Sequence, residues 1–451
     1  MSELKLGKLG RVLLIGVLIR FVMAPFFAHP LDVYSWYVVG QNLLSDRSAF
    51  LNYLVPYDYS FFLFAFPGYL AYIFLSPYFP NFLIQMSSLN PELNPGAHFG
   101  ITVVPGLLFD LLVKIPLIIS DTLVAYFLYK IVQKKFNDKR LAISACLLWF
   151  LNPLTIWVSS GWGMFDTLPT LCSVLALYLL NTRKFAMSAF FLVVGIFLKY
   201  YAVVLFIPLA ILAWSIGGSK GLRRLVISFV FTSIVFSVPL TRQVISGFTG
   251  LLLGSPFIAG SYHYSGLSIW TPLTLFVPNV NQGLLSILLL LPFMTAFYIW
   301  IFVRRSNSPS YDVFIFTIPL LFLLTMYSAT EANFFVWVMP FVAIFAAFNE
   351  KTKRLYWAIS LVVLFSSVTV SLLPYYLLPV SPWIGADLVK ALTYFSPYKV
   401  ESGTGVINSG ITLGKIFLSS LSLVTCLLLT ILGLRLTKTK KIGQGYFEAS
   451  T

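Results

Sequence analysis

Long apolar runs, each about the length of a membrane crossing, recur along the whole chain and constrain what it can fold into. A helix needs roughly 20 mostly apolar residues to cross a hydrocarbon layer about 30 Å thick. Only 10% of the residues are charged and 59% are hydrophobic, whereas a soluble domain carries about a quarter charged residues. So few charges cannot cover a water-facing surface, and the sequence therefore predicts an all-α polytopic membrane protein.

The apolar runs predict about twelve transmembrane helices. The first run follows a basic segment but lacks a small-residue cleavage site, so it is expected to be a retained helix rather than a signal peptide. The stretch 185–214 is interrupted by Lys199 and fits either a hairpin of two short helices or one tilted span. The predicted spans are 10–28, 107–132, 141–158, 164–181, 185–198, 200–215, 225–240, 284–303, 311–329, 333–349, 355–373 and 413–434.

Basic residues form short clusters between the apolar runs, and such clusters mark the cytoplasmic side of a membrane. They fall on one side if both termini are cytoplasmic and the number of spans is even. The net charge of +15 therefore reflects topology, and no nucleic-acid partner is expected. The outer segments are then 29–106, 159–163, 241–283, 330–332 and 374–412.

The long outer segments are rich in aromatic residues and proline rather than hydrophilic. Segment 57–80 fits either a thirteenth span or a helix lying at the outer surface, and the parity of the basic clusters favours the surface helix. Interfacial helices are therefore expected in the long non-cytoplasmic loops. Two parts are expected: a core module, 1–215, with the large outer loop 29–106, and a variable C-terminal transmembrane module, 216–451, with outer loops 241–283 and 374–412.

Asp32 follows the first span and stands beside Tyr34 and other aromatic residues. Ionisable residues at the mouths of spans are costly and are therefore functional candidates. A partly desolvated carboxylate at the outer surface suits a general base that deprotonates a sugar hydroxyl. The alternative is a structural role as the N-cap of a helix over 33–44.

Most of the other charged residues have more than one interpretation. Lys199 needs an anionic partner, which is either a lipid phosphate or a carboxylate such as Asp166. Arg242 either shares that phosphate bidentately or contacts ordinary lipid head groups. Asp166, which follows a tight glycine-containing turn, binds sugar hydroxyls, fixes Lys199 or caps the next helix. Asp110 and Lys114 are four residues apart and are expected to pair within their helix.

The three histidines, at positions 29, 98 and 263, are too scattered to indicate a metal site by spacing. The three cysteines lie within predicted spans and are interpreted as small packing residues.

Several stretches together carry a resemblance to a known family, although no single one would do so alone. They are LDVYSWYVVGQNLL, VPYDYSFF, KIPLIISDTLVAYFLYKI, WFLNPLTIWVSSGWGMFDTLPTLCSVLALYLL, FLKYYAVVLFIPL and EANFFVWVMPF. By these stretches the chain resembles the GT-C glycosyltransferases, which use polyprenyl-phosphate sugars. It is most similar there to the first mannosyltransferase of glycosylphosphatidylinositol (GPI) assembly and its prokaryotic and archaeal relatives.

The resemblance implies a GT-C fold and an inverting hexosyltransferase on the outer membrane face. A hexose, with mannose indicated by the family, would move from a polyprenyl- or dolichyl-phosphate donor to a lipid-linked or glycan acceptor. Asp32 would be the catalytic base, and Lys199 with Arg242 would bind the donor phosphate. Substrate-binding residues would be His29, Tyr34, Asp58, Asp166, His263 and Asn333.

No metal cofactor is expected, because Pro30 stands where the family has the first of two acidic residues. Membrane lipids are expected partners, and a partner subunit is compatible with the sequence. The compact size of the chain and the absence of long loops of the glycosylated lumenal type favour a prokaryotic or archaeal cell membrane.

Two other classes compete with the enzyme. A flippase or transporter of lipid-linked sugars predicts charges throughout the mid-membrane and loops of similar size on both sides. A non-catalytic membrane scaffold would need neither the carboxylate nor the buried lysine at an outer cleft. The acidic residues and long loops crowd one side, which favours the enzyme.

Overall fold

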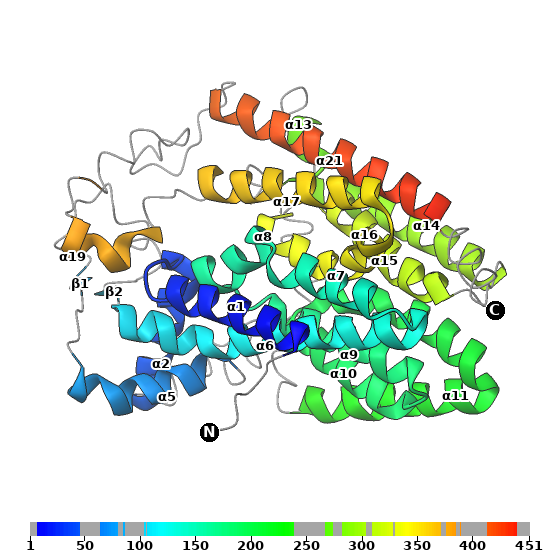
Figure 1. Cartoon of the computed structure of the whole chain (residues 1–451), viewed down its shortest axis with the longest axis horizontal. Coiled ribbons are helices and arrows are strands. Elements are labelled where there is room, and N and C mark those ends of the chain that lie inside the picture. Colours follow the sequence, from blue (N-terminus) through cyan, green and yellow to red (C-terminus); the bar gives the residue numbers. More distant parts are fainter. Residues whose placement is uncertain are drawn as a thin grey trace. The chain divides into compact units, whose positions relative to one another are not determined.

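The computed structural model describes residues 7–45, 64–79, 84–85, 103–104, 106–238, 267–273, 282–303, 309–327, 330–370, 376–384, 388 and 413–439. In these segments the regular structure is helical apart from one short ladder (Figure 1). In that ladder β1 (Ile84–Gln85) pairs antiparallel with β2 (Val103–Val104), with Ile84 opposite Val104 and Gln85 opposite Val103.

Three described helical segments are long and apolar enough to cross a membrane. They are Leu107–Phe136, Tyr200–Ser237 and Ser419–Thr437. A fourth crossing is added if α7 (Lys139–Phe150) and the segment Pro153–Trp162, which are bent by 48°, count as one broken span. The chain is thus an all-α membrane protein, as predicted, but a twelve-span GT-C fold is not confirmed.

The chain forms two compact units that are interleaved along the sequence. The first comprises residues 1–123, 150–168 and 364–410, and the second comprises 124–149, 169–363 and 411–451. These two units are groups of residues that pack together. The predicted division at residue 215 is of another kind, because it separates a core module from a variable transmembrane module along the sequence. That division stays a prediction.

The first unit is built around an aromatic core between α2 (Pro30–Ser45), α5 (Phe66–Leu75) and the start of α6 (Leu107–Phe136). Tyr37, Phe64, Tyr69 and Phe109 are all buried in this core. Gly68 allows the close approach of α5 to α6, since a Cβ there would lie 2.6 Å from Val113 Cα. The helices of this unit are α1 (Lys8–Met23), α2 (Pro30–Ser45), α5 (Phe66–Leu75), η2 (Ser76–Tyr78), the first half of α6 (Leu107–Phe136), α8 (Pro153–Ile156), the π-helical η6 (Trp157–Trp162), η10 (Leu378–Val380) and α19 (Ser381–Ile384).

Helix α5 lies within the predicted surface segment 57–80. Its ten residues extend about 15 Å, which is half the thickness of the hydrocarbon layer. The described part of this segment is therefore too short for a crossing. Residues 57–63 lie outside the described residues, so both alternatives for segment 57–80 stay predictions.

The second unit is centred on η9 (Ala332–Trp337) and α16 (Met339–Phe348). Every residue of η9 is buried, as is α16 from Met339 to Ala346. Around them are α7, α9 (Thr167–Asn181), α10 (Phe185–Leu198), η7 (Tyr200–Leu205), α11 (Phe206–Ser237), α13 (Trp270–Leu273), α14 (Gln282–Val303), α15 (Pro309–Met326), α17 (Glu350–Val370) and α21 (Leu413–Thr439).

The stretch 185–214 forms a hairpin, which is one of the two arrangements predicted for it from the sequence. Helix α10 ends at Leu198, Lys199 is extended with φ −159°, and the chain turns back through η7 into α11. Gly195 near the end of α10 lies against Ala202, while Gly217 in α11 lies against Phe185 at the start of α10. The two segments are therefore antiparallel.

Candidate functional site

Asp32 lies in the first turn of α2 in the first unit. The helix begins at Pro30, which suits a first helical position because that position needs no N–H donor. The Asp32 carboxylate is 29% exposed, and its Oδ2 lies 2.7 Å from His29 Nδ1. The indole Nε1–H of Trp162 donates to the same oxygen at 2.6 Å. Asp32 and His29, both predicted site residues, thus form one site, and Asp32 is not the helix N-cap.

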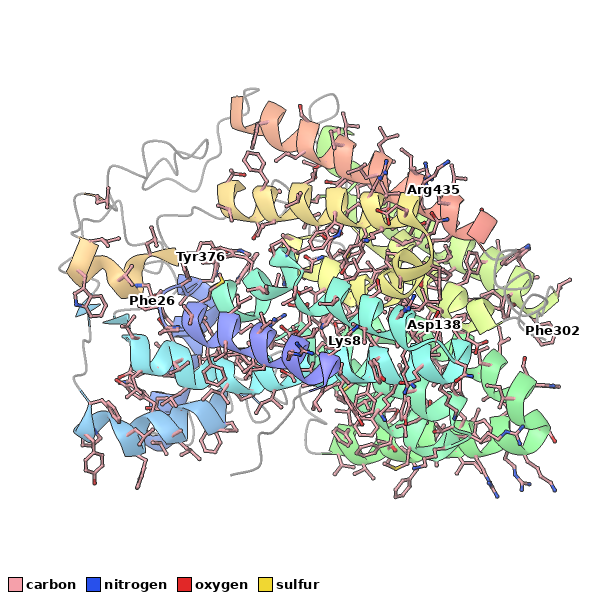
Figure 2. The ribbon with its side chains drawn as sticks, in the orientation of Figure 1. Lys8, Phe26, Asp138, Phe302, Tyr376 and Arg435 are labelled. Atoms are coloured by element: carbon pink, nitrogen blue, oxygen red, sulfur yellow. The ribbon has the colours of Figure 1, made fainter. Side chains whose placement is uncertain are left out.

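Aromatic rings enclose this carboxylate. The His29 ring stacks on Trp162 with centroids 5.1 Å apart, and the Tyr376 ring lies 5.3 Å from His29. Backbone hydrogen bonds fix the arrangement, because the His29 N–H donates to Trp162 O and the Ala28 N–H donates to Tyr376 O, the residue labelled in Figure 2. Sequence reasoning did not assign Trp162 or Tyr376 to the site, since nothing in the spacing joins three distant segments.

The turn after η6 positions Trp162. Trp162 is the last residue of η6, and the next residue, Gly163, has a left-handed backbone conformation with φ +83°. A Cβ at Gly163 would lie 2.7 Å from Val33 Cγ2 and 2.8 Å from Lys114 Cε. Only glycine fits both this backbone conformation and this space, so the glycine of the Gly-Trp-Gly turn sets how closely η6 approaches α2 and α6.

A set of buried polar side chains lies behind the site. Lys114 donates to the backbone oxygens of Ala24, at 2.8 Å, and of Phe27. Asp110 is fully buried, and neither of its carboxylate oxygens meets a hydrogen-bond partner among the described residues. Asp110 and Lys114, which were expected to pair, attract each other electrostatically but form no hydrogen bond, because Lys114 donates to the end of α1 instead.

Tyr34, another predicted site residue, belongs to this buried set rather than to the surface. Its side chain is fully buried, and its hydroxyl meets no hydrogen-bond partner among the described residues. Burial raises the pKa of the Tyr34 hydroxyl well above its ordinary value, and the nearby Asp110 carboxylate raises it further. Tyr34 is thus a neutral hydroxyl in the interior of the first unit. Asp166 is also in this unit and is fully buried.

Lys199 forms a second, separate cluster in the second unit. Its side chain is 3% exposed, and its Nζ lies 4.4 Å from the centroid of the Phe334 ring and 5.4 Å from that of Trp337. Tyr201 stacks on Trp337 with centroids 3.8 Å apart. Such cation–π contacts stabilise an ammonium group away from water. Asn333, buried in the same η9 segment, is the predicted site residue that accompanies Lys199.

Three predicted site residues, Asp58, Arg242 and His263, lie outside the described residues. Within the described ranges no group of three or more His, Cys, Asp or Glu side chains could hold a metal ion.

The fold and these two clusters define a helical membrane protein in which the partly exposed carboxylate of Asp32 lies beside aromatic rings and Lys199 is covered by aromatic rings. A family model described as PIG-U, the GPI transamidase subunit PIG-U, matches residues 97–285. The match covers less than half of the chain. It includes Asp166, Lys199, Arg242 and His263, whereas Asp32 and Asn333 lie outside it.

This match overturns the identification as a GT-C mannosyltransferase. A subunit of a transamidase is not a polyprenyl-phosphate-mannose-dependent hexosyltransferase, so the predicted glycosyl transfer, its polyprenyl-phosphate-sugar donor and its lipid-linked or glycan acceptor are wrong. The assignments of Asp32 as base for that reaction, and of Lys199 with Arg242 as donor-phosphate ligands, lose their basis.

The stretches that suggested a glycosyltransferase contain residues that hold the helices together. Lys114, in the KIPL stretch, bonds to backbone oxygens at the end of α1. Asn152, in the NPLT stretch, accepts at its side-chain oxygen a hydrogen bond from the Leu154 N–H and caps α8. Similarity in such positions reports how membrane helices pack rather than which reaction a protein performs.

Proposed function

We propose that this chain is a membrane-embedded subunit of a GPI-type transamidase complex, and that it contributes ligand binding rather than the attacking nucleophile. The observation that carries the proposal is the family match over residues 97–285. That range includes α6 to α11, which hold two of the three helical segments long enough to cross a membrane.

The cysteines support a non-catalytic role. Transamidation exchanges one amide bond for another, and a cysteine attacking an amide needs an adjacent base. Cys146, Cys172 and Cys426 are all buried, and a buried thiol does not reach a peptide substrate. Another subunit would then supply the nucleophile.

The Asp32 site has the composition expected for a polar head group at a membrane surface. Asp32 and His29 offer charge and hydrogen bonds, while Trp162 and Tyr376 offer ring faces. Carboxylates accept strong hydrogen bonds from hydroxyl and amine groups, and Trp and Tyr favour the interface between lipid and water. We therefore assign Asp32 to binding a hydroxyl- or amine-bearing head group.

The topology that accompanies this role is the one indicated by the basic clusters. About twelve crossings would place both termini in the cytoplasm and the Asp32 site on the opposite side. Several shorter helices would contribute to crossings together with their neighbours, as α7 does with α8 and η6. The assignment to a prokaryotic or archaeal cell membrane stays a prediction.

The decisive experiment compares glycolipids in cells with and without the chain after labelling with [³H]mannose. Loss of a transamidase subunit leaves sugar transfer intact, so the complete anchor glycolipid should accumulate while protein attachment to it stops. Accumulation of a glycolipid that lacks a mannose would contradict the proposal. Affinity purification of the tagged chain in a mild detergent should also recover other subunits and transamidase activity.

The Asp32 site is tested by complementation of the deleted strain. Asp32→Asn should lower protein attachment at least tenfold while the complex still assembles, because the amide cannot provide the carboxylate's charge. Asp138→Asn is the matched control: it makes the same charge change at a residue whose side chain accepts hydrogen bonds from the Arg140 and Leu141 N–H groups at the start of α7. Equal attachment in both variants would exclude Asp32 from binding.

A further inference from the structure

Exposed basic side chains from two separate segments meet at one end of α10 and α11 in the second unit. Arg183 and Lys184 directly precede α10, whereas Lys220, Arg223 and Arg224 follow the break at Gly218 in α11. All five side chains are exposed, and they are called the basic patch below. The proposed function uses none of these residues.

The packing of α10 against α11 brings the two segments together (Figure 1). Phe185, which follows Lys184 in the chain, lies against Gly217 and Gly221 of α11. A Cβ at Gly217 would lie 2.5 Å from Phe185 Cζ, and a Cβ at Gly221 would lie 3.0 Å from the same atom. These glycines stand on either side of the break at Gly218, so the basic residues of both segments lie around one turn.

The part of α11 that follows the break runs away from this turn beside α10. Ser228 Oγ donates to Ala186 O at 2.8 Å near the start of α10, and the rings of Phe236 and Phe197 lie 5.6 Å apart near its end. Residues 219–237 are therefore parallel to α10. The basic patch lies where both of these helices begin.

The positive charge of the patch is not compensated within the described residues. None of the five side chains forms an ion pair there, and Asp166, in the first unit, is the only acidic residue between positions 139 and 311. The first turn of α10 has no acidic residue and no side-chain cap. Helix N-termini carry a partial positive charge, so two helix starts add to the five basic groups. The patch therefore favours a negatively charged ligand.

An exposed apolar stripe on α11 begins at the patch. Ile227, Phe231 and Ile234 are 61%, 67% and 57% exposed, and their spacing places them on the helix face that starts with Arg223 and Arg224. From Arg224 to the end of α11 the helix extends about 20 Å, which exceeds the roughly 15 Å of hydrocarbon in one leaflet. The stripe is thus long enough to lie beside an acyl chain of one leaflet.

We propose that the basic patch binds the phosphate of an anionic phospholipid, while one acyl chain of that lipid lies along the apolar stripe. The occupant is a lipid rather than a soluble anion, because the charges and the stripe continue into each other on one helix face. Clusters of about four to eight basic residues at the cytoplasmic end of a membrane helix attract anionic lipids, and this end is predicted to face the cytoplasm. The lipid offsets the repulsion between the five charges.

The test titrates the full-length chain, freed of bound lipid in detergent, with dioleoyl phosphatidylglycerol or dioleoyl phosphatidylcholine and measures binding by native mass spectrometry. The wild type should bind phosphatidylglycerol at least fivefold more tightly. Arg223→Gln with Arg224→Gln should abolish this preference, because two charges of the patch are lost. Arg183→Gln with Lys184→Gln should act in the same way from the other segment.

A matched control removes two charges elsewhere in the same unit. Lys351→Gln with Arg354→Gln changes exposed residues at the start of α17 and should keep the wild-type preference. Dihexanoyl phosphatidylglycerol has the same head group with short chains and should bind at least tenfold more weakly than the dioleoyl lipid. Glycerol 3-phosphate, a soluble anion, should not displace the dioleoyl lipid.

The proposal is overturned if both patch variants fold with wild-type melting temperatures and keep the wild-type preference, or if the control pair loses it as well. It is also overturned if the wild type binds the two dioleoyl lipids equally, if the short-chain lipid binds as tightly as the long-chain one, or if glycerol 3-phosphate displaces the lipid. Loss of a co-purifying protein from the patch variants with unchanged lipid binding would assign the patch to a protein partner instead. None of these outcomes depends on transamidase activity.

Discussion

Arg20 and Asp121 show how individual residues keep a charge inside this protein. Both side chains are fully buried, with Arg20 Nε 2.8 Å from Asp121 Oδ2. The guanidinium also donates to Phe150 O at 2.7 Å and lies 4.2 Å from the centroid of the Phe150 ring. The pair joins α1 to α6, and it illustrates that a buried charge is tolerated when it is paired and hydrogen-bonded.

Breaking this pair should destabilise the protein strongly. Asp121→Leu leaves a buried guanidinium without its counter-charge, which costs about 3–5 kcal/mol. The double variant Arg20→Met with Asp121→Leu should recover most of that loss, because neither charge remains. Thermal unfolding in detergent measures both, and a double variant no more stable than Asp121→Leu alone would show that the charges are not coupled.

At the same scale, sequence reasoning located some site residues and misplaced others. It named His29 and Asp32 separately as site residues, and the structure places their side chains in contact, while their roles stay predictions. It assigned Tyr34 to substrate binding, whereas the Tyr34 side chain is fully buried in the core of the first unit. It could not find Trp162 or Tyr376, because only the folded chain places these rings beside His29.

At the scale of elements, breaks in helices decide where the chain reverses. The long α11 is interrupted at Gly218, whose φ of 60° and ψ of −155° are not helical. That combination is accessible essentially only to glycine. The break falls between the predicted spans 200–215 and 225–240, beside the basic residues at 220–224, so the structure agrees with a turn at this place.

Substitution of this glycine should be costly even though space is available. Gly218→Ala meets no atom within 4 Å of the new Cβ, so its cost arises from the backbone conformation and should be about 1–3 kcal/mol. Gly433→Ala is the matched control, since that position is helical and also open; it should stabilise by up to about 1 kcal/mol. Melting temperatures in detergent should move in opposite directions, and equal shifts would contradict the strain at Gly218.

At the scale of the whole molecule, the membrane topology is predicted from the basic clusters of the sequence and from the length of individual helices. The ten-residue α5 and the exposed Tyr78 that follows it lie in segment 57–80, the place where the two topological alternatives differ.

Labelling of single cysteines in sealed, right-side-out vesicles separates these alternatives. Tyr78→Cys, at a residue 75% exposed, should react with a membrane-impermeant maleimide before permeabilisation if 57–80 lies at the outer surface. Lys139→Cys, at the exposed start of α7, should react only afterwards. The wild type should remain unlabelled because its three cysteines are buried. Protection of position 78 until permeabilisation would instead place a span at 57–80.

The sequence by itself determined that this is a helical membrane protein and where most helices lie. Both follow from local properties: apolar runs of span length need lipid, and the helix must satisfy its own backbone inside it. The start of α2 at Pro30 and the break at Gly218 were not predicted from the sequence, although proline suits a first helical position and glycine suits such a backbone conformation.

Only the tertiary structure decided which side chains meet. The Asp32 site combines residues from three segments, Lys199 lies against rings of η9, and Lys114 bonds to the end of α1 rather than to Asp110. Such contacts depend on how the helices pack against one another. The hydrophobic pattern of a single helix is compatible with many such packings. The reaction assigned from sequence resemblance was wrong for the same reason, because similar packing positions occur in membrane proteins with different chemistry.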